Sequence, residues 1–196
     1  MKILQIVCNP RHPSLGATLA RESRERLLAA GHELLYHDLY EESFDPILTE
    51  AEMAQGFSLD PLVQEHCRDL SSAGGIVVVH PDWWSQPPAL LKGWVDRVFR
   101  QGIAYDLVGG DFGERSWQGL LGGKKALVLC SSDNPPGEGP SVLEEFWETS
   151  VFGACGIEAR CEVLRGLRSS GSGERRAWVE SALSLVVGYF ATSPST

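Results

Sequence analysis

The sequence predicts an α/β protein in which a parallel sheet is covered by helices on both faces. A strand, a loop, a helix and a second strand follow one another within about the first 40 residues, which is the βαβ pattern of a parallel sheet. Residues 76–79 are all β-branched, as expected of a central strand that is buried on both faces. Together these patterns predict a doubly wound α/β sandwich.

The other elements follow from local patterns along the chain. Residues 90–99 carry apolar side chains on one stripe and charged ones opposite, which predicts an amphipathic helix. Residues 40–59 are polar and are expected to form a long excursion, and the Gly-rich residues 102–123 are expected to be irregular. The complete prediction is strands at residues 2–8, 32–39, 74–80, 126–131 and 157–164, helices at residues 17–30, 60–72, 90–99, 142–154 and 174–191, one domain over residues 1–191 and a disordered tail at residues 192–196.

Composition excludes some classes of protein. The chain of 196 residues has a formal net charge of -9, which argues against binding the phosphate backbone of nucleic acids. Nucleotide cofactors remain possible, because backbone N–H groups at a helix N-terminus can hold their phosphates. The five cysteines have no metal-site spacing and are expected to be free buried thiols in a reducing compartment. No apolar run is long enough for a membrane span and no signal peptide is recognisable, so we expect a cytoplasmic protein.

Ligands of such a sheet bind at the carboxyl ends of its strands. Three loops are predicted there, at residues 9–16, 81–88 and 132–140. No G-x-G-x-x-G or G-x-x-x-x-G-K-[ST] sequence follows a strand, which argues against a Rossmann dinucleotide site and a P-loop. In the first loop, Ser14 can cap the next helix and, with the free N–H groups that follow, bind an anion. Plain helix capping without a ligand is the alternative.

The second loop contains two adjacent tryptophans, Trp83 and Trp84, at the end of the central strand. Two such side chains are unfavourable to expose, so they could cover the following helix, line a dimer interface or flank an aromatic cofactor. Pro87 and Pro88 stiffen the loop, because proline fixes its own φ and restricts the preceding residue. A stiff loop of this kind suits a ligand that needs an apolar wall and hydrogen bonds along one edge.

The stretch PDWWSQPPALLKGWVDRVFRQGIAY resembles the signature of the flavodoxin-like NAD(P)H:quinone oxidoreductase family. That family includes DT-diaphorase and the flavoprotein ancillary subunits of bacterial potassium-efflux systems. Residues 38–53 and 119–128 also resemble the family, so the similarity covers nearly the whole chain. The matching positions of the signature are Pro81, Trp84, Pro88, Ala89, Leu91, Lys92, Gly93, Trp94, Asp96, Arg97, Val98, Phe99, Gly102, Ala104 and Tyr105.

The resemblance implies a flavodoxin-like, three-layer sandwich with a five-stranded parallel sheet in the order 2-1-3-4-5. It also implies a bound FMN, with FAD as the alternative, and a homodimer whose interface completes the site. The implied phosphate-side residues are Asn9, Pro13, Ser14, Leu15 and Gly16. The implied contacts of the flavin ring are Pro81, Asp82, Trp83, Trp84 and Ser85 along one edge and Ser131, Ser132, Asp133 and Asn134 near the other.

The activity implied by the resemblance is hydride transfer from NAD(P)H to flavin N5, followed by reduction of a quinone or a similar small electrophile. The cofactor performs this chemistry and the protein supplies binding, orientation and electrostatics. A regulatory or redox-sensing module with little turnover is the alternative, and an electron-carrier flavodoxin is a third possibility.

The chain departs from the family pattern in the loops around the implied site. It has no Tyr or His from residue 106 to residue 188, where studied family members carry such a pair, so no catalytic residue is assigned. Asp133 and Asn134 replace glycines usual in the family, and Asp133 and Glu138 add negative charge, the wrong sign for stabilising an anionic flavin. In the first loop, Asn9 and Gly16 stand where many members have other residues.

Overall fold

Five parallel strands form the central sheet of the computed structural model, which describes residues 1–109, 115–135 and 141–191. Their order is β2-β1-β3-β6-β7, with every neighbouring pair parallel, which confirms the predicted order 2-1-3-4-5. The strands are β1 (Lys2–Val7), β2 (Glu33–Asp38), β3 (Gly75–Pro81), β6 (Lys125–Ser131) and β7 (Glu158–Leu164).

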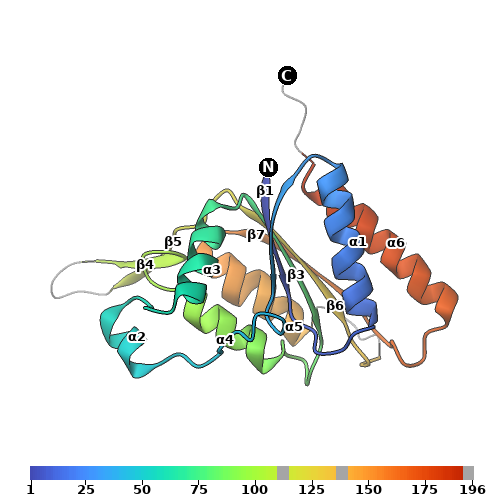
Figure 1. Ribbon diagram of the computed structural model, residues 1–196, viewed down its shortest axis with the longest axis horizontal. Helices are drawn as coiled ribbons and strands as arrows, with labels where there is room; N and C mark the ends of the chain where they lie inside the picture. Colours follow the sequence, from blue (N-terminus) through green and yellow to red (C-terminus); the bar gives the residue numbers. More distant parts are fainter. Residues whose placement is uncertain (110–114, 136–140, 192–196) are drawn as a thin grey trace.

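Helices cover both faces of this sheet. Figure 1 shows α1 and α6 on one face and α3, α4 and α5 on the other, so the fold is the expected flavodoxin-like three-layer sandwich. The helices are α1 (Leu15–Ala29), α2 (Glu50–Gln55), α3 (Pro61–Ser72), α4 (Ala89–Val98), α5 (Val142–Glu145) and α6 (Ser172–Tyr189). None of the helices in the described ranges has the length and apolar character needed to cross a membrane.

The central strand shows why its sequence is continuously apolar. Ile76 and Val78 pack into the core on the α3–α4 side, whereas Val77 and Val79 pack into the core on the α1–α6 side. Successive side chains of a strand point to opposite faces, so a strand covered on both sides needs apolar residues at every position.

Two segments for which no helix or strand was predicted contain regular structure. The polar excursion holds the short helix α2, which begins with a capping box between Thr49 and Glu52. The Gly-rich segment holds an antiparallel pair, β4 (Tyr105–Val108) and β5 (Ser116–Gly119), so the prediction of an irregular chain there was wrong. The rings of Tyr105 and Trp117 stack at a centroid distance of 3.6 Å, and Trp117 Nε1 donates to the carbonyl of Ala154 at 2.6 Å.

The predicted helix at residues 142–154 is present with a changing hydrogen-bond pattern. It begins as α5, continues as a π-helix over Phe146–Phe152 and ends as a 3₁₀ turn over Gly153–Cys155. Its wide middle segment buries Trp147 against the sheet. The predicted disordered tail at residues 192–196 lies outside the described residues.

Candidate functional site

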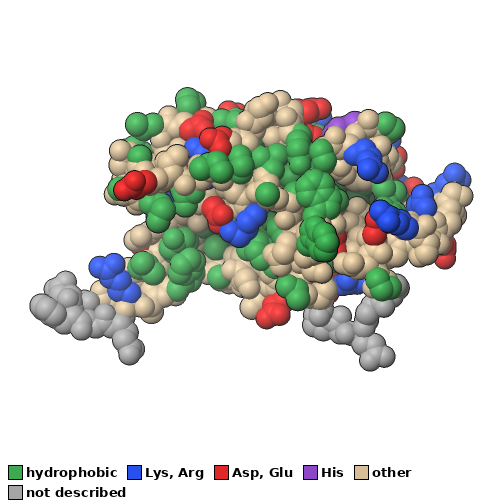
Figure 2. Space-filling model, turned by 90° about the horizontal axis from the view of Figure 1, so that it is seen from below, with side chains coloured by type: hydrophobic (Ala, Val, Ile, Leu, Met, Phe, Trp, Pro, Cys, Tyr) green, Lys and Arg blue, Asp and Glu red, His purple; other side chains and the backbone are tan. Residues whose placement is uncertain are grey.

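The predicted loops leave neighbouring strands at one edge of the sheet. Strands β1, β3 and β6 are adjacent and parallel, so the segments that follow them emerge at the same end. Figure 2 views the molecule from the end opposite the N-terminus and shows hydrophobic side chains gathered in the middle of this face, with charged groups around them. An apolar surface with a polar rim is typical of a binding region.

The first loop forms its own hydrogen-bonded unit around Ser14. The Ser14 hydroxyl accepts from Asn9 Nδ2 at 3.1 Å and from the N–H of Ala17 at 3.0 Å, so Ser14 caps α1 as the sequence predicts. The N–H groups of Leu15 and Gly16, in the first turn of α1, donate to no described residue. Free N–H groups at the start of a 15-residue helix are a suitable anion site.

Asn9 and Gly16, the two departures in this loop, explain one another. A Cβ atom at Gly16 would lie 2.6 Å from Asn9 Nδ2, closer than real Cβ contacts allow. The Asn9 side chain is buried, and its Oδ1 accepts from the N–H of Arg11 at 3.0 Å. A side chain at residue 16 would therefore require the Asn9 amide to move away from its present hydrogen bonds.

The second loop is a tight turn with an unusual backbone. Trp83 and Gln86 exchange both backbone hydrogen bonds, at 3.0 Å and 3.2 Å. The two residues between them, Trp84 and Ser85, have φ values of 60° and 61°, a left-handed conformation that a bulky residue rarely adopts. Such conformations gather at functional sites, where the surrounding structure maintains them.

This turn leaves both apolar surface and hydrogen-bond donors free. The Trp84 side chain is 98% exposed and the Trp83 side chain 43% exposed. The N–H groups of Trp84 and Ser85 donate to no residue in the part of the chain that the structure describes. A planar ligand that accepts hydrogen bonds along one edge would match this arrangement.

Asp82 connects the second loop to the third. Its N–H donates to the carbonyl of Ser131 at 2.8 Å. Its Oδ2 accepts from Ser132 Oγ at 2.6 Å and from Asn134 Nδ2 at 2.9 Å. Asn134, which departs from the family pattern, therefore has a structural role in joining the two loops.

Asp133 lies apart from this contact. Its carboxylate is half exposed and pairs with Arg168 at 3.0 Å, which offsets part of the negative charge that the sequence places in this loop. Such an exposed pair contributes little to stability. The second acidic residue noted there, Glu138, lies outside the described residues.

His80 supports the second loop from inside the protein, a role that sequence reasoning did not find. The residue is buried, and its Nε2 accepts from Trp147 Nε1 at 3.0 Å. Because an indole N–H can only donate, the His80 proton is on Nδ1, which donates to the carbonyl of Pro81 at 2.8 Å. Burial lowers the pKa of His80 to about 4, so the ring is neutral at pH 7.

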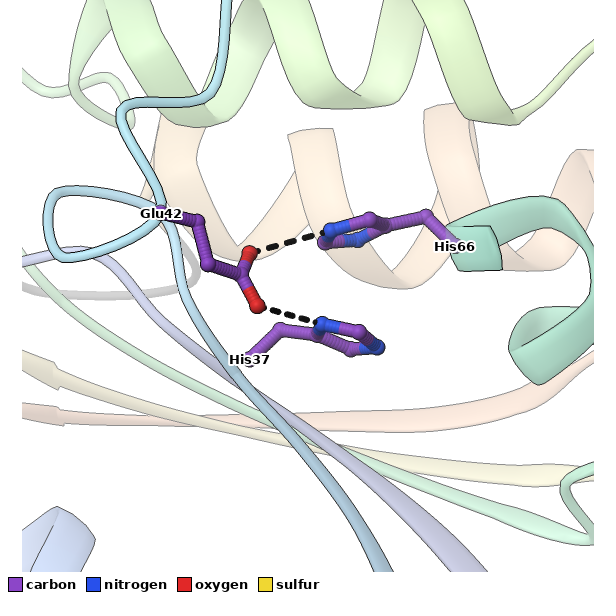
Figure 3. A group of neighbouring side chains, drawn as sticks. All are labelled: His37, Glu42 and His66. Atoms are coloured by element: carbon purple, nitrogen blue, oxygen red, sulfur yellow. Dashed lines mark hydrogen bonds and ion pairs between the residues drawn. The ribbon is translucent and has the colours of Figure 1, made fainter. Parts of the chain in front are cut away.

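A second histidine cluster lies on the α3–α4 side of the sheet. Figure 3 shows the Glu42 carboxylate between His37 and His66, with bonds of 2.7 Å to His37 Nδ1 and 3.0 Å to His66 Nε2. These three groups lie close enough together to surround a metal ion. His37 Nε2 also faces Asp69 Oδ2 at 2.9 Å.

The tautomer of His66 argues against a metal centre here. His66 Nδ1 faces Trp94 Nε1 at 2.9 Å and must accept, because the indole N–H only donates. The proton of neutral His66 is therefore on Nε2, the nitrogen that faces Glu42, and no lone pair is available there for a metal ion. The geometry is that of a hydrogen-bond network joining β2, α3 and α4.

The structure thus groups the predicted site residues into two units. The first unit surrounds the start of α1 and contains Asn9, Pro13, Ser14, Leu15 and Gly16. The second is held together by Asp82 and contains Pro81, Asp82, Trp83, Trp84, Ser85, Ser131, Ser132 and Asn134.

Comparison with known proteins identifies the family. The family described as having a flavodoxin-like fold matches residues 1–176. The chain belongs to this flavodoxin-like family. A solved structure of an NAD(P)H:quinone oxidoreductase from Methanothermobacter marburgensis superposes with a TM-score of 0.80 at 24% identity, covering 98% of each chain. At this identity the structural similarity shows the fold.

The chain is also similar in sequence to three proteins whose names state an oxidoreductase activity. An uncharacterised NAD(P)H oxidoreductase of Haemophilus influenzae is 36% identical over 182 residues, which is 86% of this chain and 85% of the relative. YcaK of Escherichia coli (strain K12), also an uncharacterised NAD(P)H oxidoreductase, is 33% identical over 133 residues, 63% of this chain and 66% of YcaK. An FMN-dependent NADH:quinone oxidoreductase of Hyphomonas neptunium is 32% identical over 100 residues, 51% of this chain and 44% of the relative. The chain spans less than two thirds of the last two relatives.

Proposed function

We propose that this chain is an NAD(P)H-dependent flavin oxidoreductase that binds FMN and reduces a quinone or a similar small electrophile. The observation that carries the proposal is the turn at residues 83–86, where Trp84 and Ser85 keep free N–H groups beside an exposed indole. The names of the relatives support the same activity, because they specify NAD(P)H, FMN and quinone.

The residues fit FMN in charge and in shape. The phosphate would be held by the free N–H groups of Leu15 and Gly16 and by the positive end of the α1 dipole, without a basic side chain. The ring would lie against the turn, where Trp84 supplies an apolar face and two N–H groups supply donors. This set suits the dianionic phosphate and acceptor-rich ring of a flavin.

The chemistry that bound FMN supplies is acceptance of a hydride from NAD(P)H and delivery of two electrons to the acceptor. The protein orients the bound flavin and stabilises its reduced form. His80 donates to the Pro81 carbonyl, and the left-handed backbone of Trp84 and Ser85 presents two free N–H donors. Backbone N–H groups then take the stabilising role for which the sequence offers no Tyr or His between residues 106 and 188.

Three further expectations belong to this proposal. The chain forms a homodimer, because Trp84 is 98% exposed and a second copy would cover the apolar surface around it. It acts in the cytoplasm, since the five cysteines are free and buried, as in proteins of a reducing compartment. Residues 1–191 form one domain. FAD in place of FMN would be revealed by the mass of the extracted flavin.

Flavin titration tests the proposal directly. The purified chain should bind FMN, and the bound flavin absorbance should bleach anaerobically on addition of NADH or NADPH. Trp84→Ala should weaken FMN binding about tenfold, or about 1.4 kcal/mol, because the ring loses its apolar wall. Trp117→Ala is the matched control, since Trp117 is also exposed but lies in the β4–β5 pair.

Two results would contradict the proposal in different ways. A chain that binds neither FMN nor FAD has no flavin site, and equal affinities for the Trp84 and Trp117 variants would separate the turn from the flavin. Bound flavin that stays oxidised under both nicotinamides would favour the redox-sensing module, which the missing Tyr and His residues also favour.

A further inference from the structure

The Asp82 carboxylate has two oxygens with different surroundings. Oδ2 accepts two hydrogen bonds, from Ser132 Oγ at 2.6 Å and from Asn134 Nδ2 at 2.9 Å. Ser132 Oγ in turn accepts from the N–H of Asn134 at 3.1 Å. A single oxygen therefore fixes the beginning of the third loop against the second loop.

Oδ1 is buried and has no hydrogen-bond partner in the described part of the chain. An unpaired buried carboxylate oxygen is unfavourable, so its presence in a loop at a candidate binding edge needs a reason. The carboxylate accepts two hydrogen bonds and donates none, as an ionised group does.

The negative charge of Asp82 is not neutralised by a neighbouring cation within the described ranges. Arg165 pairs with Glu144 at 3.0 Å, and Arg168 pairs with Asp133 at 3.0 Å. His80, the nearest imidazole in the sequence, is a neutral ring whose single proton is engaged by the Pro81 carbonyl. An uncompensated charge in a partly buried site acts over several ångströms, because the local dielectric is low.

We propose that Asp82 is a positioning residue that also sets the reduction potential of the flavin. This inference rests on the proposed function, because it requires a flavin beside residues 81–85. Uptake of a hydride adds one negative charge to the flavin. The Asp82 carboxylate opposes that charge and keeps the midpoint potential low, which makes the reduced flavin a stronger reductant of its acceptor.

The two effects of Asp82 can be separated by mutation. In Asp82→Asn the amide oxygen can take the place of Oδ2 and keep both hydrogen bonds, while the NH₂ group takes the place of the unpartnered Oδ1. This variant removes the charge and keeps the connection between the loops. The double variant Ser132→Ala with Asn134→Ala keeps the charge of Asp82 and removes the connection between the loops.

The midpoint potential and the FMN affinity are measured for both variants. D82N should bind oxidised FMN within about twofold of wild type and bind reduced FMN about tenfold more tightly, which is a rise of about 30 mV in a two-electron potential. The double variant should bind both forms several-fold more weakly, with little change in potential. Asp96→Asn is the charge control and should leave the potential unchanged, because Asp96 is partly exposed and paired with Lys92 at 2.6 Å.

Each failure has a separate meaning. An unshifted potential in D82N, or equal shifts in D82N and Asp96→Asn, would overturn the role of Asp82 while leaving the proposed function intact. Failure of the wild-type chain to bind flavin would overturn the proposed function itself. If D82N does not fold, Asp82→Ser compared with the double variant gives the same answer, since both lose the connection and only Asp82→Ser loses the charge.

Discussion

Two buried tryptophan–histidine pairs lie on the same side of the sheet and serve different purposes. Trp94 donates to His66 Nδ1 at 2.9 Å, and Trp147 donates to His80 Nε2 at 3.0 Å. Because opposite ring nitrogens accept, the two histidines have opposite tautomers. The N–H of His66 donates to the Glu42 carboxylate, whereas the N–H of His80 donates to the Pro81 carbonyl, just before the turn at residues 83–86.

The difference between the pairs is in what lies beside each histidine. His37 stacks on His66 at a centroid distance of 3.8 Å. Burial, and then repulsion from His37, lower the pKa of His66 to about 3. Burial also lowers the pKa of His80, but its bond to Pro81 and the charge of Asp82 work in the opposite direction, so that pKa is about 4. The same motif therefore stabilises the packing of helices in one place and orients a loop in the other.

The largest expected effect is the dependence of the free energy of unfolding on pH. Both histidines stay neutral in the folded protein well below the pKa of about 6.5 that they have when unfolded. Only the unfolded chain takes up these protons between pH 6.5 and pH 4, so stability is full above this window and falls as the pH falls. Between pH 7 and pH 5 each histidine should lower the free energy of unfolding by about 2 kcal/mol. Urea titrations at several pH values measure this loss.

Single replacements assign this loss to the two histidines. His66→Gln and His80→Gln should each remove about half of the decrease, in addition to their constant costs. Glu42 works in the opposite direction, because burial raises its pKa and the folded state then favours its protonated form at low pH. The combined loss of about 4 kcal/mol is therefore an upper value. A stability that does not change between pH 7 and pH 5 would mean that the rings are not buried as neutral groups.

The second test acts on the His66 side alone. In Glu42→Ala both carboxylate oxygens are removed, so the His66 Nε2–H loses its acceptor and His37 Nδ1 loses its partner. The free energy of unfolding should fall by about 2 kcal/mol, a value reduced for the partial exposure of Glu42. Urea unfolding measures the fall, with Glu41→Ala as the exposed control. An unchanged stability, or a changed FMN affinity, would contradict the separation of the two regions.

Sequence patterns were sufficient where local rules or long apolar runs decide the structure. The parallel strands and the Ser14 cap follow the prediction from these patterns. The strand order was implied by the family resemblance and is confirmed. The β4–β5 pair was missed because its stability depends on distant contacts. Trp117 bonds to Ala154, and a Cβ at Gly119 would lie 2.4 Å from the backbone of Cys155. No local pattern in a Gly-rich segment reports such contacts.

The candidate site was predicted as a set of residues but not as a set of interactions. The sequence lists Asp82 and Asn134, 52 positions apart, as separate contacts near different edges of the implied flavin ring, and the structure shows that they bond to each other. Asn9 and Gly16 are a similar pair, in which one side chain fills the space that the other leaves. Departures from a family pattern are thus easier to interpret in contacting pairs than one at a time.

The smallest expected effect is a difference in FMN affinity between variants of Trp147 and Trp94. Trp147→Phe and Trp94→Phe each remove one indole N–H from a fully buried ring and leave a histidine nitrogen without its donor. Both changes should reduce stability by a similar amount, about 2 kcal/mol, because the lost hydrogen bond and the lost volume are alike. The two stability costs therefore cancel when the variants are compared with each other.

Flavin binding should distinguish them. Without the Trp147 indole N–H, the His80 ring loses one of the two hydrogen bonds that fix its orientation, so its bond to the Pro81 carbonyl is held less firmly. The turn at residues 83–86 is then held less rigidly, and FMN affinity should fall several-fold, or about 1 kcal/mol. Trp94→Phe should leave the affinity unchanged, because the His66 network continues through Glu42 to His37 and Asp69 and includes none of the predicted site residues. Equal FMN affinities in the two variants would show that the hydrogen bond from His80 to Pro81 does not control the candidate site.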